Sequence, residues 1–308
     1  MRLTGMFLPT SPELPWRQPA VRDLACLLTG RAPWLTPDDL PDALLLGADG
    51  MRRLAMLDND PAPLRRWLAA RPVRRLGHYA EQLLAFWFDH SPHIELVAHN
   101  LVLRDKGLTL GEFDFLLRID GQPWHLETCS KFYLQCGKGA SGLVGPSLRD
   151  AWLLKQDKLA QQLRLSRHAL ARQVLPPGFE APRTGALVRG CFFYRQAPDE
   201  AAFAPATQWQ GWMADCEQPW PCRDASSRWL WLPRMRWLSP ALAASGEVGS
   251  AQALRVQMTQ AEAPQMVAEM VAEEGGWREL RRGFVLPSRW PDAGRLVQLQ
   301  QQMPTGAC

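Results

Sequence analysis

The amino-acid sequence predicts an α/β protein in which helices flank a central mixed sheet. A helix, three strand-like runs, a second helix and a further strand follow one another between residues 75 and 196. An Asp-Gly pair at 120–121 separates two of the apolar runs, and such a pair is a strong hairpin signal. We therefore expect a helical N-terminal region over 1–74, an α/β core over 75–196, and a C-terminal extension over 197–308 that packs on the core or adds strands to it.

Each element of the core has its own signal. The run RLGHYAEQLLAFWFDH carries apolar residues on one broad stripe and predicts a buried amphipathic helix that ends near Ser91-Pro92. Branched and aromatic residues bounded by turn signals predict three successive strands, at 93–105, 110–119 and 122–134. A Gly-rich loop then leads to a long helix over 147–175, with Ser147 as its cap, and a last strand follows at 184–195.

Composition narrows the class of protein. The 308 residues are 46% hydrophobic, with a net charge of +4, which indicates a folded protein and not a polycation. We expect no membrane segment, because no apolar run approaches the length that crosses a bilayer. The seven cysteines form no CxxC pair, so we expect free thiols, a cytoplasmic location and no structural zinc site. All of the lysines lie between residues 106 and 158.

The C-terminal extension concentrates tryptophan, with eight of the 14 Trp residues beyond position 196. These rings can form a second small core or additional strands, and we favour that interpretation over a surface on which nucleic-acid bases stack.

Two neighbouring strands carry acidic residues that can converge. Alternate side chains of a strand share a face, and the hairpin at 120–121 brings Asp114 beside Glu127. Two adjacent carboxylates repel, and a divalent metal with oxygen ligands relieves that repulsion. Lys131 lies on the same row as Glu127 and can stabilise developing charge on a phosphate, while Glu81 on the preceding helix offers a third ligand.

A purely structural interpretation remains open for these residues, because acids on an exposed sheet face commonly form ion pairs. His125 lies on the same row as Glu127 and, with His78, is one of the two histidines worth testing. Cys129, in the middle of an apolar strand, is better explained as a small buried residue than as a nucleophile.

The run GEFDFLLRIDGQPWHLETCSKFYL resembles the core of the PD-(D/E)XK nuclease-like superfamily, in which a helix with Glu precedes a strand with Asp and a strand with E-x-K. Most of the chain resembles the bacterial DUF1853 family, through GHYAEQLLAFWF, GEFDFLL, HLETCSKFYL, GPSLRDAWLLKQDKLAQQLRLS and RRGFVLPSRWP. The resemblance implies a restriction-endonuclease-like core. It also implies that Glu81, Asp114 and Glu127 bind Mg²⁺ or Mn²⁺.

The sequence departs from the superfamily at one position. Cys129 stands where E-x-K has its lysine, and Lys131 lies two residues further along the same face, where its reach can replace the missing cation. If Lys131 points elsewhere, the fold can persist without catalysis.

The second helix is basic, and its cations have two interpretations. Its cations can contact a nucleic-acid backbone or can form an ordinary solvated face, and four of them are candidate contacts: Arg149, Lys155, Lys158 and Arg164. We therefore expect a metal-dependent nuclease-like protein that hydrolyses nucleic-acid phosphodiesters. The alternative is a catalytically inactive nuclease-fold module that binds nucleic acid or a protein partner.

Overall fold

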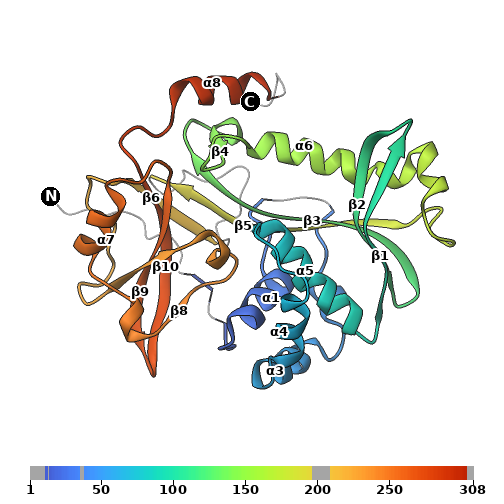
Figure 1. The fold of residues 1–308 in the computed structure, drawn as a ribbon, viewed down its shortest axis with the longest axis horizontal. Coiled ribbons are helices and arrows are strands. Elements are labelled where there is room, and N and C mark those ends of the chain that lie inside the picture. Colours follow the sequence, from blue (N-terminus) through green and yellow to red (C-terminus); the bar gives the residue numbers. More distant parts are fainter. Residues whose placement is uncertain (1–10, 13, 35–37, 196–208, 304–308) are drawn as a thin grey trace. The chain divides into compact units, whose positions relative to one another are not determined.

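A computed structural model describes residues 11–12, 14–34, 38–195 and 209–303 (Figure 1). The chain is a mixed α/β protein in which helices flank a large mixed sheet with the strand order β1-β2-β3-β5-β6-β10-β9-β7. β6 runs parallel to both β5 and β10, and the other pairs described by register are antiparallel. The strands are β1 (Ile94–Asp105), β2 (Leu108–Ile119), β3 (Gln122–Gln135), β4 (Leu143–Val144), β5 (Arg183–Tyr194), β6 (Gln210–Asp215), β7 (Arg228–Leu232), β8 (Leu242–Ala243), β9 (Gln265–Glu273) and β10 (Gly276–Leu286).

The chain forms two compact units. The first unit comprises Met1–Leu14, Lys131–Lys155 and Gly190–Cys308, and the second comprises Pro15–Ser130 and Gln156–Arg189. The α-helices are α1 (Pro19–Thr29), α2 (Asp42–Leu46), α3 (Gly50–Asn59), α4 (Ala62–Ala69), α5 (Leu76–His90), α6 (Trp152–Leu163), α7 (Ala251–Met258) and α8 (Ala293–Gln301). In the described part of the chain, no helix combines the length and the apolar character needed to cross a membrane.

The hairpin expected at Asp120-Gly121 is confirmed. Asp120 and Gly121 have φ angles of 49° and 76°, and two successive positive values match the right-handed twist of the strands they join. β2 and β3 pair in antiparallel register from Phe115 with Leu126 to Ile119 with Gln122.

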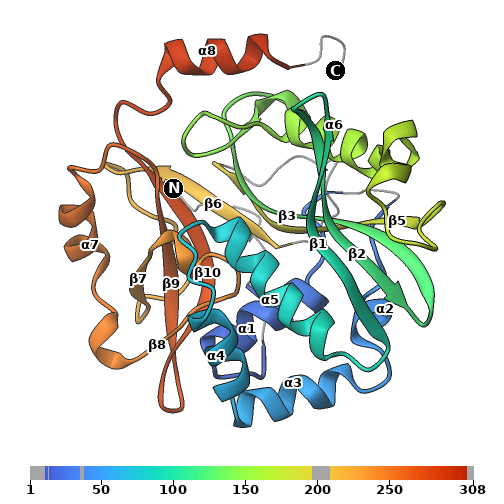
Figure 2. The same ribbon diagram turned by 45° about the vertical axis from the view of Figure 1, so that its right-hand side comes forward.

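α5 covers the meander of β1 to β3 in the second unit. It lies against β1 (Figures 1 and 2). The edge of Phe88 meets the ring of Phe115 on β2 at 5.1 Å between centroids. Trp87 is buried and donates its indole N–H to the carbonyl of Leu45 at 2.8 Å. Burial of each large apolar side chain contributes roughly 2–3 kcal/mol, so this face anchors the helix that carries Glu81.

The helix predicted over 147–175 is shorter than expected, and Ser147 does not cap it. α6 begins only at Trp152, because Leu148 has a φ of 53° and Gly145 N–H bonds to the carbonyl of Asp150 at 2.8 Å, which closes a turn. After α6, the 3₁₀ helices Leu165–Arg167 and Ala169–Gln173 replace the predicted continuation. His168 separates them by accepting a hydrogen bond from Leu170 N–H through its side chain.

Three tryptophans of the first unit lie inside a hydrophobic core. Trp212, Trp220 and Trp229 are buried and pack against Val267 and Val285. The rings of Trp220 and Trp229 meet edge to face at 5.0 Å. These three rings are therefore core side chains and are not available to stack on bases.

Candidate functional site

Asp114 and Glu127 lie where the ladder between β2 and β3 stops. The last described pair is Phe115 with Leu126, and continuing its register places Asp114 opposite Glu127. Side chains take over the hydrogen bonds at this point: Asp114 Oδ2 accepts from Thr128 N–H at 2.8 Å, and Glu127 Oε1 accepts from Asp114 N–H at 3.4 Å. The structure thus brings together the two acids that the hairpin pattern singled out.

His125 contacts this pair from within β3. Its Nε2 donates to Glu127 Oε1 at 2.8 Å, and both side chains are completely buried. The edge of the Phe113 ring lies against the imidazole, with 4.9 Å between centroids. Burial lowers the pKa of His125 to about 4, although the charge of Asp114 opposes this effect.

The contact with Glu127 by itself favours a charged imidazolium, but we conclude that complete burial prevails and that His125 is neutral. A neutral ring that donates from Nε2 keeps its lone pair on Nδ1, which has no hydrogen-bond partner among the described residues. The period-two row on β3 was the only sequence signal for this contact.

Lys131 is held by a partner that the sequence did not indicate. Its ammonium pairs with Asp150 Oδ2, and Tyr133 donates its hydroxyl to the same oxygen at 3.2 Å. Lys131 and Asp150 both lie in the first unit, with about a third of each side chain exposed. No spacing rule connects Asp150 with β3, because it lies in the turn before α6.

Glu81 belongs to α5 and bonds to His78, whose Nδ1 lies 3.1 Å from Glu81 Oε2. Its charge also acts on His99, where burial lowers the histidine pKa and Glu81 opposes that change. His99 stacks on Phe115 at 4.5 Å, so Glu81 is near the sheet face that α5 covers. Across the described ranges, no three His, Cys, Asp or Glu side chains gather as a metal site, so Glu81 does not complete a cluster with the two acids.

A family model described as "Domain of unknown function (DUF1853)" matches residues 22–286, which is most of the chain. The chain belongs to the DUF1853 family. The match runs from within α1 to the end of β10 and includes each residue that the sequence singled out for the site. No curated protein and no solved structure matches this DUF1853 chain.

The donor set in this DUF1853 protein suits a hard divalent cation. Mg²⁺ prefers oxygen ligands and commonly uses one or two carboxylates, with waters and substrate phosphate filling the other positions. Asp114 and Glu127 supply two carboxylates on neighbouring strands. Both side chains are therefore of the ligand class that Mg²⁺ and Mn²⁺ prefer.

The four basic candidates of the DUF1853 chain lie on and around α6. Arg149 is exposed in the turn before the helix, Lys158 is exposed on it, and Arg164 is exposed directly after its end. Lys155 is half-buried near the start of the helix. The cations expected to contact nucleic acid thus remain largely available to solvent.

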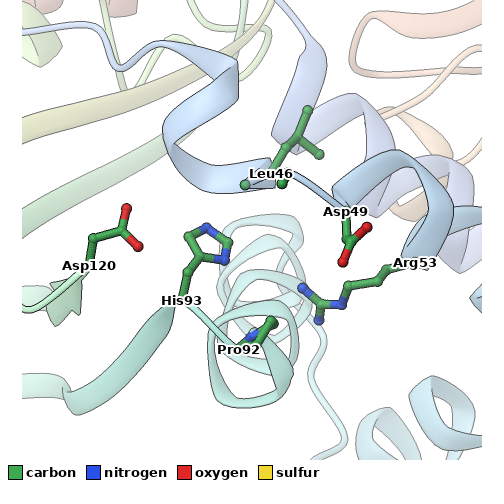
Figure 3. A pocket seen from close by; sticks show the side chains of 8 residues that line it. Leu46, Asp49, Arg53, Pro92, His93 and Asp120 are labelled. Carbon is green, nitrogen blue, oxygen red and sulfur yellow. The ribbon is translucent and has the colours of Figure 1, made fainter.

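A pocket of about 330 Å³ lies elsewhere in the second unit, where α2 turns into α3 (Figure 3). His93 points into it, and His93 Nε2 donates to the carbonyl of Leu44 at 3.2 Å. Arg53 donates to Ser91 Oγ at 2.9 Å and to the carbonyl of His90 at 2.8 Å. These contacts link α3 to the end of α5 and link α2 to the residue before β1.

Proposed function

We propose that this DUF1853 protein is a metal-dependent nuclease-like enzyme that hydrolyses nucleic-acid phosphodiesters. The observation that carries the proposal is the pair formed by Asp114 and Glu127 at the point where β2 and β3 stop pairing. The resemblance to the PD-(D/E)XK superfamily supports the same assignment through the motif on these two strands.

In this proposal Asp114 and Glu127 hold Mg²⁺ or Mn²⁺. Bound there, the ion would lower the pKa of a water and neutralise charge on the scissile phosphate. Thr128 N–H donates to the Asp114 carboxylate and His125 donates to that of Glu127, so these contacts would orient the two ligands. Lys131, which follows Glu127 along β3, would supply the cation for the developing negative charge.

A second candidate function is a catalytically inactive nuclease fold that binds nucleic acid or a protein. Two observations favour it. Cys129 occupies the lysine position of E-x-K, and the ammonium of Lys131 is already paired with Asp150. Such a module would use the exposed cations around α6 for binding and would show no turnover.

A cleavage assay separates the two candidates. The full chain is incubated with Mg²⁺ or Mn²⁺ and with single-stranded, duplex or branched DNA or RNA. We expect metal-dependent products that fall at least about a hundredfold in Asp114→Asn, because a lost metal ligand removes about 3 kcal/mol of transition-state stabilisation. Glu127→Gln and Lys131→Ala should show comparable losses, whereas Glu95→Gln on β1 should cleave like the wild-type protein.

Folding is checked by thermal unfolding, since Glu127 is completely buried. If no substrate is cleaved and neither metal raises the melting temperature, the catalytic proposal is wrong and the binding module remains.

A further inference from the structure

A second pocket, of about 380 Å³, lies in the first unit between the turn before α6 and helix α8. Figure 1 shows α8 next to the β4 segment, and Leu299 of α8 packs with Val144 of β4. The apolar floor of the pocket is formed by Leu148 and Leu299, which pack in one buried cluster with Val144 and Ala151. Its polar lining consists of Arg149, Arg295, Gln298 and Gln302. The pocket therefore joins one candidate basic residue to a helix that lies beyond the span of the family match.

The turn that carries Arg149 is fixed on both sides. Leu148 adopts a left-handed φ of 53°, which bulky residues rarely occupy, and its N–H bonds to the carbonyl of Gly145 at 2.9 Å. Asp150, on the other side of Arg149, is held by Lys131 and Tyr133 of β3. The fold thus sets where the backbone of Arg149 lies, in a conformation that the local sequence does not favour.

α8 presents its polar side chains at matching positions. Arg295, Gln298 and Gln302 follow the three- and four-residue spacing that places side chains on one helical face. Leu299 lies buried beneath them, and Asp292 caps the helix by accepting a hydrogen bond from Arg295 N–H at 2.8 Å. The docked helix therefore brings a second arginine to the pocket.

The lining has cations and amides but no acidic side chain. Neither Arg149 nor Arg295 forms an ion pair within the described ranges, and the nearby acids Asp150 and Asp292 are engaged with Lys131 and with the α8 backbone. Two guanidinium groups without an internal acid match the oxygens of a phosphate, which arginine binds through two parallel hydrogen bonds. Glutamine amides can donate to and accept from the sugar or base next to that phosphate.

We propose that this pocket binds a backbone phosphate of a nucleic-acid strand, with Arg149 and Arg295 on the phosphate and Gln298 and Gln302 beside the attached nucleoside. The choice of a nucleic acid as the ligand rests on the proposed function, whereas the phosphate chemistry follows from the lining itself. The pocket would hold the strand as a binding site separate from the two acids.

The test is a binding titration of the full-length protein in EDTA, so that cleavage cannot occur. The probe is a fluorescein-labelled oligothymidylate, measured by anisotropy at several salt concentrations. We expect the double variant Arg149→Gln/Arg295→Gln to bind about tenfold more weakly or worse, with a salt dependence smaller in slope by about 0.7, because one neutralised phosphate is lost. Gln298→Glu/Gln302→Glu, which places negative charge in the pocket, should weaken binding further.

Arg66→Gln on α4 is the matched control, since it removes one exposed arginine outside the pocket and should bind like the wild-type protein. Thymidine monophosphate and inorganic phosphate are added as competitors. Weak competition by both supports a backbone phosphate, whereas displacement of the oligonucleotide by either compound at micromolar concentration would overturn that choice in favour of a free phosphate ligand.

The inference is overturned if the wild-type chain does not bind the oligonucleotide in EDTA, or if both double variants bind within about twofold of it. A protein that binds in this way but never cleaves with metal retains this inference and loses the proposed catalysis. A protein that cleaves normally while both double variants bind unchanged retains the proposed catalysis and loses this inference.

Discussion

At the scale of single residues, burial decides the protonation of the candidate site. His125 lies 2.8 Å from Glu127, which would favour an imidazolium, yet neither side chain is exposed to solvent. Removing a charged imidazole from water costs more free energy than the contact with Glu127 provides, so the ring remains neutral. The protonation of His125 is therefore a property of the fold, and it makes the stability of the protein depend on pH.

We predict that acid destabilises the protein through His125. Burial lowers its folded pKa to about 4 from the ordinary value of 6.5, so the unfolded chain binds more protons between these two values. The stability that a neutral His125 provides is fully present above about pH 6.5 and is lost as the pH falls towards 4. Urea unfolding should show a loss of about 2 kcal/mol between pH 7 and pH 5 from this residue.

The matched comparison is between His125→Gln and His78→Gln. The first variant should lose this part of the pH dependence, because glutamine does not titrate, and the second should retain it, because more than half of the His78 side chain is exposed. An identical pH dependence in His125→Gln and the wild-type protein would show that burial does not control this group.

At the scale of elements, one buried acid on β9 ties a loop to the sheet. Glu269 Oε1 accepts from Arg223 N–H at 2.8 Å and from Ser227 Oγ at 2.9 Å, and its Oε2 accepts from Arg281 Nε on β10 at 2.5 Å. Burial alone would raise the pKa of Glu269, but Arg281 and these loop donors hold the pKa below its ordinary value. The carboxylate therefore links β9, β10 and the segment before β7.

We predict that Glu269→Ala lowers the free energy of unfolding by about 3–5 kcal/mol, because it leaves the buried guanidinium of Arg281 without its acid. Glu273→Ala is the control on the same strand. Its partner Arg278 lies at 3.0 Å in a partly exposed pair, so the loss should be at most about 1 kcal/mol. Equal losses for the two variants, measured by urea unfolding, would contradict this account.

At the scale of the whole molecule, β3 and β5 each run through both compact units. On β3 the residues up to Ser130 belong to the second unit and those from Lys131 belong to the first. On β5 the residues up to Arg189 belong to the second unit and those from Gly190 belong to the first. Gly190 has a φ of 137°, and a Cβ atom there would lie 1.7 Å from the carbonyl oxygen of Lys131. The two strands can approach each other here only because residue 190 has no side chain.

We predict that Gly190→Ala destabilises the protein by about 3 kcal/mol or more, because the added methyl group clashes with backbone and the conformation disfavours any L side chain. Gly246→Ala, where a Cβ atom would meet no neighbour within 4 Å, should change stability by no more than about 0.5 kcal/mol. Thermal unfolding of both variants measures the difference, and a Gly190→Ala protein as stable as the wild type would disprove the close approach.

Much of the meander and half of the candidate site could be predicted from the sequence, since both depend on short-range patterns. Periodicity gave α5 and the three strands to within a few residues, and the Asp-Gly pair fixed the register that sets Asp114 opposite Glu127. The prediction failed at the helix over 147–175. Leu148 there adopts a left-handed φ of 53° in a turn that is closed by backbone hydrogen bonds of Gly145 with Leu148 and Asp150, and this turn delays the start of the helix to Trp152.

The sequence by itself determined the α/β class through the order of helix-like and strand-like segments over 75–196. It also determined the hairpin and the pairing of the two acids, because these follow from strand period and turn chemistry over fewer than twenty residues. Only the tertiary structure decided that His125 is buried and neutral, that Lys131 pairs with Asp150, and that α8 brings Arg295 to the pocket beside Arg149. Those outcomes depend on desolvation and on contacts between segments far apart in the chain, and no local pattern encodes either of them.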